Sequence, residues 1–354
     1  MALCCVTPVF SLGLSAHSAI LMDGDTGQVL YEKNPDEISL IASTTKIMTA
    51  LVTLEQSGLQ DVVVIPREAV GIEGSSMYLK EGEERSVEDL LHGLMLSSGN
   101  DAAVALAIAV SGDVTDFVGL MNEKAQSLGL THTHFANPNG LDSAENYATA
   151  RDLATLTAEA LKNDDFRRIV STKSYHCEGH DLTNHNKLLW QYTGALGVKT
   201  GFTKRSGRCL VSAAMKDGKL AVAVTLNDPD DWNDHANLLN YGLDAIKQTN
   251  YSPKISCYNI PVIGSSEEQI EVFIEPYTVN TLETKELSCE VNLPKFLYAP
   301  VSKGDILGTV EYKMGDEVIG TVQLTALRDI PALPEKISFY DKIKQNIRYI
   351  LKCI

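Results

Sequence analysis

The sequence predicts an α+β fold in which an antiparallel sheet is flanked by helices, followed by a small all-β domain and a C-terminal amphipathic helix. Helical apolar spacing and strand-like segments mix from about Ala19 to Ile246. Strands lie at both ends of that section with helices between them, which predicts a sheet covered by helices. From Ser252 onward, short alternating segments are separated by Gly, Pro, Asn and Asp, which is typical of β-structure alone.

Polar capping residues and turn signals place the elements of the first section. Residues 19–34 predict a strand, a Gly-Asp-Thr-Gly turn and a second strand. Apolar residues at helical spacing follow Ser43 and end before Gly58, which can act as a C-cap. We expect further helices after Ser86, Asp101, Asp113 and Thr149, a hairpin at Asp217-Gly218, and an amphipathic helix that turns Trp232, Leu238, Leu239 and Leu243 inward.

Length and pattern divide the chain into two domains. A chain of 354 residues exceeds one ordinary domain. We assign residues 18–250 to the mixed domain and residues 251–333 to the all-β domain. The boundary is placed in a linker from Asn250 to Pro253, because Pro253 disfavours continuing the preceding helix.

The two ends of the chain have patterns of their own. Residues 1–17 form an apolar run that ends in small residues near Ser15 and Ala16. This run resembles the remnant of a secretory signal peptide, although a basic region at its start is missing. Residues 334–354 place apolar side chains along one helical stripe and Lys and Arg on the rest. Such a helix predicts binding to an anionic membrane surface, with a packed terminal helix as the alternative.

Composition restricts the classes of partner. The formal net charge of −16 and the pI of 4.9 argue against nucleic acid, because phosphates would be repelled. The seven cysteines contain no Cys-x-x-Cys pair. The nearest group of metal-ligating residue types lies in a polar stretch that predicts a loop or an edge strand. We therefore expect neither a metal nor another cofactor, and the group consists of His176, Cys177, His180 and His185.

One short motif suggests nucleophilic catalysis. Ser43 precedes Lys46 by three residues at the start of a predicted helix, so the two side chains point the same way. A serine hydroxyl is a poor nucleophile near neutral pH and needs a neighbouring base. Lys46 can act as that base when its pKa is lowered by burial and by a second cation nearby. Taken alone, the same pattern also fits a helix cap followed by a solvated lysine.

Two further motifs make the catalytic interpretation stronger. Ser98-Gly99-Asn100 lies in a polar break between two apolar helices, where its side chains can face a cleft. Lys199-Thr200-Gly201 lies on a predicted strand just before the late hairpin. The order Ser-x-x-Lys, Ser-x-Asn, Lys-Thr-Gly matches the signature of penicillin-interacting serine enzymes.

Longer strings resemble one family of these enzymes, the low-molecular-mass D-alanyl-D-alanine carboxypeptidases. Four strings are similar to sequence motifs of that family, namely SGNDAAVALA, FANPNGLD, YATARDLA and GVKTGFTKRSGRCLV. The similarity extends through the β domain and the C-terminal tail. Parts of it resemble the sporulation-associated members from Gram-positive spore formers. The resemblance implies a serine-type enzyme that removes the terminal D-alanine from peptidoglycan stem peptides. It further implies covalent inhibition by β-lactams and a place outside the cytoplasm, at the membrane surface and cell wall.

The resemblance and the chemistry together assign a role to each motif residue. Ser43 attacks the peptide carbonyl to form an acyl-enzyme, Lys46 takes its proton, and Ser98 passes a proton to the leaving amine. By resemblance, the backbone N–H groups of Ser43 and Phe202 stabilise the oxyanion. Gly201 lets the substrate backbone approach closely. The remaining substrate-binding residues are Asn100, which holds the substrate amide or the lysine, and Lys199 and Thr200, which hold the terminal carboxylate.

The sequence departs from the family in one place. Many relatives have an arginine just after the late hairpin that helps to bind the substrate carboxylate. Here that place reads NDPDDWNDHAN, without arginine. Arg208 and Lys204 are the candidates to replace it, and the sequence does not choose between them.

Three other functions compete with the carboxypeptidase interpretation. A β-lactamase shares the three motifs, but it needs a base for rapid deacylation of the acyl-enzyme. The nearest acid, Glu145, lies in a segment that resembles the carboxypeptidases. A catalytically silent binder of wall peptides has no use for a buried neutral lysine beside a serine. A metal-dependent peptidase is disfavoured by the spacing of cysteine and histidine.

Overall fold

The computed structural model describes residues 12–281, 287–333, 343–344 and 346–348. The chain divides into two compact units, residues 1–246 and 247–354. The division falls after Ile246, because strand β12 (Lys247–Tyr251) already pairs with β15 (Tyr277–Thr281) of the second unit. Residues 250–251 of the predicted linker therefore belong to a strand.

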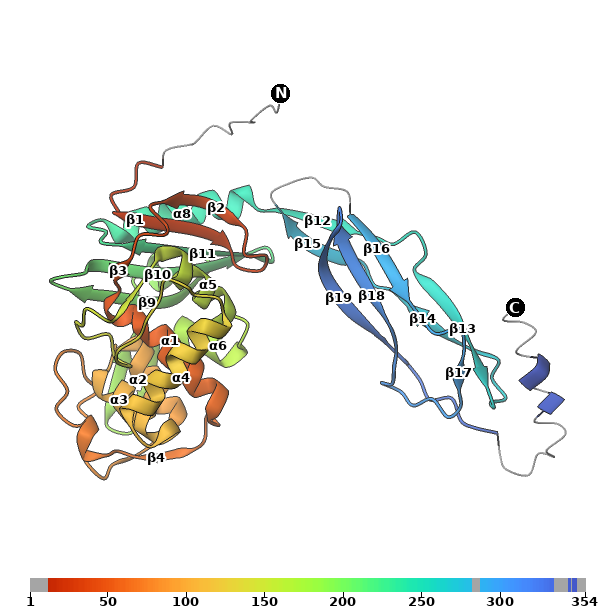
Figure 1. Cartoon of the computed structure of the whole chain (residues 1–354), viewed down its shortest axis with the longest axis horizontal. Helices are drawn as coiled ribbons and strands as arrows, with labels where there is room; N and C mark the ends of the chain where they lie inside the picture. The colour runs from red at the N-terminus through yellow and green to blue at the C-terminus, as the bar shows by residue number, and fades with distance from the viewer. Residues whose placement is uncertain (1–11, 282–286, 334–342, 345, 349–354) are drawn as a thin grey trace. The chain divides into compact units, whose positions relative to one another are not determined.

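A five-stranded antiparallel sheet forms the frame of the first unit, as the sequence predicts (Figure 1). The late hairpin supplies β10 and β11, and its turn residues Asp217 and Gly218 have φ values of 51° and 74°. Positive φ at both positions is what a two-residue hairpin turn needs. The strand order is β2 (Val29–Lys33), β1 (Ser18–Asp23), β11 (Lys219–Leu226), β10 (Gly207–Lys216) and β9 (Ala195–Thr203), so β9 lies at an edge.

Helices flank the sheet of the first unit, and their predicted caps are largely confirmed. Ser86, Asp113 and Thr149 each accept a backbone N–H three residues ahead. The helices are α1 (Lys46–Gln56), α2 (Val87–Leu96), α3 (Asn100–Ser111), α4 (Val114–Ser127), α5 (Ala150–Ala160), α6 (Asp164–Ser171), α7 (Leu188–Gln191) and α8 (Asp231–Ala245), with short 3₁₀ helices at Ala42–Thr45 and Arg67–Ala69.

Two details of the helices differ from the prediction. Helix α6 was not predicted, although its buried Phe166, Ile169 and Val170 stand at helical spacing; Asn163 caps it by accepting the N–H groups of Asp165 and Phe166. Trp232 of α8 was predicted to point inward with the leucines. It packs against the cluster that contains these leucines, but it is only half-buried and also lines a surface cavity.

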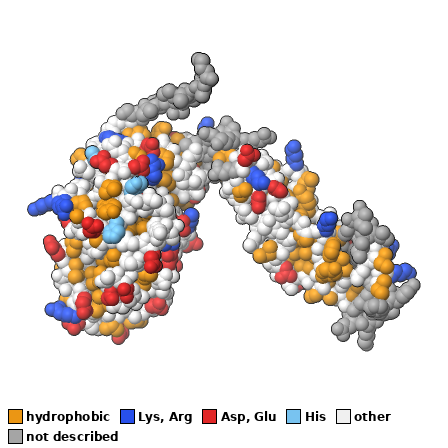
Figure 2. All heavy atoms as spheres, in the orientation of Figure 1, with side chains coloured by type: hydrophobic (Ala, Val, Ile, Leu, Met, Phe, Trp, Pro, Cys, Tyr) orange, Lys and Arg blue, Asp and Glu red, His pale blue; other side chains and the backbone are white. Residues whose placement is uncertain are grey.

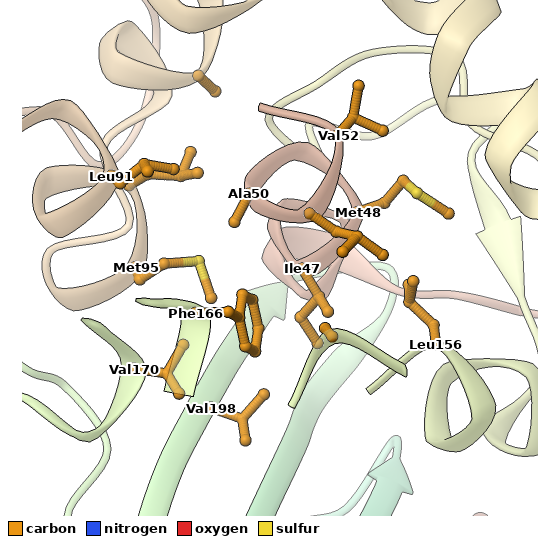
Figure 3. Close-up of a cluster of buried hydrophobic side chains, with 14 of the residues drawn as sticks. Ile47, Met48, Ala50, Val52, Leu91, Met95, Leu156, Phe166, Val170 and Val198 are labelled. Carbon is orange, nitrogen blue, oxygen red and sulfur yellow. The ribbon is translucent and has the colours of Figure 1, made fainter. Parts of the chain in front are cut away.

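Both faces of the sheet are covered, which places α1 at the centre of the unit. Helix α8 packs its buried Leu238 and Leu239 on one face. On the other face, Ile47 and Met48 of α1 lie in a cluster with Phe166 of α6 and Val198 of β9 (Figure 3). The first eight residues of α1, Lys46 to Thr53, are all buried. The start of α1 is therefore fixed against the edge strand β9.

Three small two-stranded ladders complete the first unit. They join β3 (Ser39–Leu40) to β6 (Tyr147–Ala148), β4 (Val62–Val64) to β5 (Glu84–Ser86), and β7 (Ser174–Cys177) to β8 (His180–Thr183).

The second unit contains only β-strands among its described residues up to 333, which confirms the predicted all-β domain. Its core is formed by Ile260, Val262, Val272, Val310 and Leu324. Figure 2 shows hydrophobic side chains at the surface of this unit, and acidic ones spread over the visible face of the first. The strands other than β12 and β15 are β13 (Cys257–Ile263), β14 (Gln269–Phe273), β16 (Leu287–Asn292), β17 (Leu297–Tyr298), β18 (Ile306–Met314) and β19 (Glu317–Thr325).

The chain ends are described in part. Of the predicted signal remnant, residues 1–11 lie outside the described residues. Ala16 is buried, and the N–H groups of Ser15 and Ala16 donate to Asp234 Oδ2 over 2.7 and 3.2 Å. Of the predicted C-terminal helix, residues 343–344 and 346–348 are described, and they are helical and exposed.

Within the described ranges, no single helix is both long and apolar enough to cross a membrane. Helices α3 and α4 pass that test as a pair, by length and composition, but they meet at 86°.

Packing around Gly93 in α2 yields a stability prediction. Alanine is favoured over glycine in a helix by about 1 kcal/mol. At Gly93, however, an added Cβ would lie 1.7 Å from the sulfur of Met77, which is only 2% exposed. We expect Gly93→Ala to lower the free energy of unfolding by about 1–3 kcal/mol, measured by urea denaturation.

The matched control is Gly119→Ala in α4. Gly119 is exposed and a Cβ there meets no atom within 4 Å, so the variant should be stabilised by up to about 1 kcal/mol. Equal gains for the two variants would contradict the packing around Met77.

Candidate active site

The candidate nucleophile lies in a tight turn directly before α1. Ser43 is part of the 3₁₀ helix Ala42–Thr45, so it lies one turn before α1 and is not the N-cap of that helix. The hydroxyls of Thr44 and Thr45 donate to the carbonyls of Ile41 and Ala42, over 2.6 and 2.9 Å. Ala42 has a φ of 46°, a left-handed conformation that costs free energy in a residue other than glycine. The hydrogen bonds of Thr44 and Thr45 thus hold the turn in this shape, and Ser43 lies just before the first residue of α1.

Lys46 occupies a fully buried position beneath Ser43. Its Nζ lies 3.1 Å from Ser43 Oγ, donates to Asn100 Oδ1 over 2.7 Å, and donates to the carbonyl oxygen of Asn139. Burial, and secondly the charge of Lys199, hold the pKa of Lys46 well below its usual range, although Asp101 acts in the opposite direction. Burial therefore shifts the balance of Lys46 toward the neutral amine.

The neighbours of Lys46 fit a neutral amine. An uncharged NH₂ group donates two hydrogen bonds and accepts one. Two of the three neighbours are carbonyl-type oxygens, which only accept, and the third is the Ser43 hydroxyl, which can donate. When Nζ is neutral, its lone pair can accept the proton of Ser43 Oγ, because Ser43 is the one neighbour of the three that can donate, and a general base requires such a contact.

The second motif lies in the turn between α2 and α3. Ser98 adopts a φ of 61°, and its side chain borders the same cavity as Ser43. Asn100 is buried, and besides accepting from Lys46 it donates through Nδ2 to the carbonyl of Glu73 over 2.6 Å. Among the described residues, none forms a hydrogen bond with Ser98 Oγ. The structure thus joins Asn100 to the lysine directly, and it places Ser98 on the cavity wall.

Asp101 is a supporting residue that the sequence analysis missed, because its position suggested only a helix start. Its buried carboxylate accepts the hydroxyl of Ser76 over 2.6 Å and the N–H groups of Met77 and Leu79 over 2.9 and 3.1 Å. These bonds fasten the loop before β5 to the first turn of α3, next to Asn100. An acidic residue in the first turn of a helix was the available signal.

The third motif lies on the edge strand β9. Lys199 is buried, its Nζ donates to the carbonyl of Thr200 over 2.9 Å, and burial lowers its pKa to about 7. Thr200, Gly201 and Phe202 follow it along the cavity. A Cβ at Gly201 would lie 3.2 Å from the backbone nitrogen of Ser43, so glycine there lets the strand edge approach the serine turn.

The three motifs meet at one cavity of about 320 Å³. Ser43, Ser98 and Thr200 each contribute to its wall, although they are far apart in the sequence. Lys46, Asn100 and Lys199 are buried and do not line it. The wall also includes residues outside the three motifs, namely Ser75, His185, Arg208, Asp231 and Trp232.

Of the two candidates to replace the missing arginine, only one reaches the cavity. Arg208 of β10 lines the wall and forms an ion pair with Asp231 at 2.7 Å. Lys204 is exposed in the turn between β9 and β10 and is not part of the wall.

Of the histidine and cysteine group considered for a metal, His185 lines the cavity, whereas the other three residues lie elsewhere. His176 and Cys177 are in β7 and His180 begins β8. His176 pairs with Asp181 and His180 with Glu83, at 2.7 and 3.6 Å. Within the part of the chain that the structure describes, no three or more His, Cys, Asp or Glu side chains are placed to hold a metal ion.

Comparison with known proteins identifies the family of both units. Residues 6–230 match the peptidase family S11, D-alanyl-D-alanine carboxypeptidase, and residues 250–332 match the C-terminal domain of penicillin-binding protein 5. A D-alanyl-D-alanine carboxypeptidase of Bacillus subtilis is 34% identical over 95% of this chain and 90% of its own length.

Solved structures agree with this result. Penicillin-binding protein 5 from Haemophilus influenzae is 30% identical with a TM-score of 0.67, over 92% of this chain and 99% of that chain. The Streptomyces K15 DD-transpeptidase is 37% identical with a TM-score of 0.62, over 65% of this chain and 98% of that chain. Together with Ser43 on the cavity wall and the buried Lys46 and Asn100 next to it, these matches show that the chain belongs to the D-alanyl-D-alanine carboxypeptidase family of serine peptidases.

Proposed function

We propose that this protein releases the terminal D-alanine from peptidoglycan stem peptides through an acyl-enzyme on Ser43. The observation that carries the proposal is the environment of Lys46, a fully buried amine 3.1 Å from Ser43 Oγ whose other two partners are carbonyl-type acceptors. A solvated lysine beside a helix cap would have no such surroundings. The proposal rests equally on membership of the carboxypeptidase family.

The reaction follows from the positions of these groups. Lys46 takes the proton of Ser43 Oγ, which attacks the carbonyl carbon of the bond between the two D-alanines. The tetrahedral intermediate collapses, the terminal D-alanine leaves after its amine receives a proton, and an ester to Ser43 remains. Ser98, on the cavity wall, carries that proton from Lys46 to the amine. Water then hydrolyses the ester and returns the free serine.

Two backbone N–H groups are assigned to the developing oxyanion. They are those of Ser43 and Phe202, which border the cavity from the serine turn and the edge strand. An edge strand leaves alternate backbone groups without a strand partner, and Gly201 allows the close approach. Each such donor contributes about 2.7–4 kcal/mol to transition-state stabilisation in comparable oxyanion holes.

The cavity argues against rapid turnover of β-lactams. Class A β-lactamases deacylate with a glutamate-activated water. Glu145, the acid considered for that role, is exposed and does not line the cavity. Among the described residues on the wall, the one carboxylate is Asp231, and both of its oxygens are bonded to Arg208. We therefore expect a β-lactam to remain attached to Ser43.

The first prediction from the proposed function concerns covalent chemistry at Ser43. After incubation with penicillin, intact-protein mass spectrometry should show a penicilloyl adduct that persists, with the modified peptide containing Ser43. With diacetyl-L-Lys-D-Ala-D-Ala, one D-alanine should be released per substrate. Ser43→Ala should abolish both, because no other hydroxyl is bonded to Lys46 among the described residues.

Different results would identify the competing functions. Rapid turnover of penicillin without D-alanine release would indicate a β-lactamase. Reversible binding of the peptide with neither an adduct nor a product would indicate a silent binder. Adding an amine acceptor tests transpeptidation, the activity named for the Streptomyces K15 enzyme.

The second prediction concerns pH. The pKa of Lys199 is lowered to about 7, so its charge is present below that pH and is lost as the pH rises through it. If Lys199 helps to bind the substrate carboxylate, kcat/KM should fall above about pH 7. The fall in kcat should occur at higher pH, because a bound carboxylate raises the pKa of the lysine.

A substrate with a C-terminal amide is the control for the pH profile. It carries no carboxylate, so its kcat/KM should not show this fall. If kcat/KM falls above about pH 7 equally for the acid and the amide substrate, the role of Lys199 in binding the carboxylate would be contradicted.

Attachment to the membrane surface is the third prediction. Ile343 and Ile347 lie four residues apart in the described part of the C-terminal helix and are 42% and 53% exposed, next to Lys344 and Arg348. We propose that this face enters the interface of an anionic membrane outside the cytoplasm. The full chain should co-sediment with anionic vesicles, and the double variant Ile343→Asp, Ile347→Asp should not.

Ile306→Asp is the matched control for the tail, because Ile306 is 60% exposed in β18 of the second unit. That variant should bind vesicles as the unmodified chain does. Equal loss in both variants would contradict a specific role for the tail. Export through a signal peptide and use during sporulation stay predictions from the sequence.

A further inference from the structure

One imidazole of the catalytic cavity has no role in the proposed acylation of Ser43. His185 lines the wall together with Ser43 and Ser98, and it is exposed. Within the ranges that the structure describes, no group forms a hydrogen bond or an ion pair with either ring nitrogen of His185. Histidine is the side chain that most often transfers protons in catalysis. An imidazole with both nitrogens available in this cavity therefore calls for a role.

Neighbouring asparagines hold His185 beside the second motif. The buried Asn184 donates through Nδ2 to two backbone carbonyls at the C-terminal end of α6, over 3.1 and 3.0 Å. Its Oδ1 accepts the N–H group of the buried Asn186 over 2.9 Å. The N–H group of His185 itself donates to the carbonyl of Leu96 over 3.2 Å, two residues before Ser98. The backbone of His185 is thus fixed at the end of α2, next to the turn that carries the second motif.

The charge state of His185 suits a base. Desolvation of the ring, and secondly the charge of Lys199, lower the pKa of His185 below its usual value. The other charged side chains on the described wall are Arg208 and Asp231, and these are paired with each other. The uncharged ring is therefore favoured near neutral pH, and one of its nitrogens carries an available lone pair.

Hydrolysis of the acyl-enzyme needs a base that water in the cavity can reach. Lys46 is fully buried beneath Ser43 and does not line the cavity. The carboxylate on the described wall, Asp231, has both oxygens bonded to Arg208. The serine and threonine hydroxyls of the wall are weak bases near neutral pH. His185 is thus the available base on the part of the wall that the structure describes.

We propose that His185 is the general base for hydrolysis of the acyl-enzyme on Ser43. A ring nitrogen takes a proton from a water molecule in the cavity, and the water oxygen bonds to the carbonyl carbon of the ester. As the tetrahedral intermediate collapses, the bond between that carbon and Ser43 Oγ breaks, and the imidazolium returns the proton to Oγ. The peptide leaves as a carboxylic acid. This inference rests on the proposed peptidase function and deepens it, because the second half-reaction then has a base separate from Lys46.

A base at this position is compatible with a penicilloyl adduct that persists. A peptide substrate loses its terminal D-alanine, and the space that it occupied becomes free for water. Opening of a penicillin leaves the corresponding amine attached through the thiazolidine ring, which still fills part of the cavity of about 320 Å³. His185 therefore acts on the peptide ester, whereas water is kept away from the penicilloyl ester.

The test separates the two half-reactions in the unmodified chain and in His185→Asn. With diacetyl-L-Lys-D-Ala-D-Ala, kcat/KM covers the steps up to release of D-alanine and should be nearly unchanged. The rate constant for hydrolysis of the acyl-enzyme should fall on the order of 100-fold, because a general base is lost. Mass spectrometry of acid-quenched reactions should accordingly show the diacetyl-L-Lys-D-Ala ester accumulating on Ser43. The rate of penicilloyl formation should not change.

Hydroxylamine distinguishes a missing base from a distorted site. Its nitrogen has a free lone pair and attacks an ester without help from a base. In His185→Asn, added hydroxylamine should release the peptide as a hydroxamate and restore turnover toward that of the unmodified chain. An accumulating ester that hydroxylamine does not release would show that the substitution blocks access to Ser43, and it would overturn the assignment.

The pH profile and a second histidine provide controls. Protonation of the ring removes the base, so hydrolysis of the acyl-enzyme should slow as the pH falls through the lowered pKa of His185. This acid limb should be absent in His185→Asn. His176→Asn is the matched control, because His176 is exposed in β7 and does not line the cavity. That variant should hydrolyse the acyl-enzyme as the unmodified chain does.

The outcomes separate this inference from the proposed function. Neither D-alanine release nor an adduct in the unmodified chain would overturn the function itself. An active unmodified chain with unchanged hydrolysis of the acyl-enzyme in His185→Asn would overturn only the role of His185. Equal falls in kcat and kcat/KM without accumulation of the ester would overturn that role as well. If thermal melting shows that His185→Asn is unfolded, His185→Gln replaces it with the same expected results.

Discussion

The burial of Lys46 is the constraint on which the rest of the site depends. A lysine ammonium ion is costly to remove from water, so a fully buried lysine loses its proton readily. The fold compensates with two carbonyl-type acceptors, Asn100 Oδ1 and the Asn139 carbonyl, and leaves the third direction to Ser43. Helix α1 keeps this arrangement in place, because its first two turns are buried in the core beneath the sheet.

The surrounding elements meet at this lysine from separate parts of the chain. The turn before α3 contributes Asn100, and Asp101 fastens that turn to the loop at Met77. The edge strand β9 approaches the serine turn closely at Gly201. In the proposed function, Ser43, Lys46 and Ser98 transfer protons, and the edge of β9 binds the substrate backbone.

A second polar assembly lies on the cavity wall, outside the three motifs. Arg208 and Asp231 form an ion pair that joins β10 to α8, and the neutral His235 fastens the same helix to β10 and β11. A buried ion pair by itself is weak support for stability, because desolvation offsets much of the attraction. Its position on the wall, with Arg208 partly exposed, fits the binding of an anion better than a purely structural role.

The sequence by itself determined the fold class, the antiparallel sheet with its late hairpin, the β domain and the three motifs, because apolar periodicity, capping residues and short motifs are local signals. It did not predict the short helix α6 or the half-buried position of Trp232. It left Lys204 and Arg208 as equal candidates, since both are cations near the same strand. Tertiary structure separated them: Asp231 lies far along the chain from Arg208, and only the packing of α8 against β10 brings the carboxylate to the guanidinium.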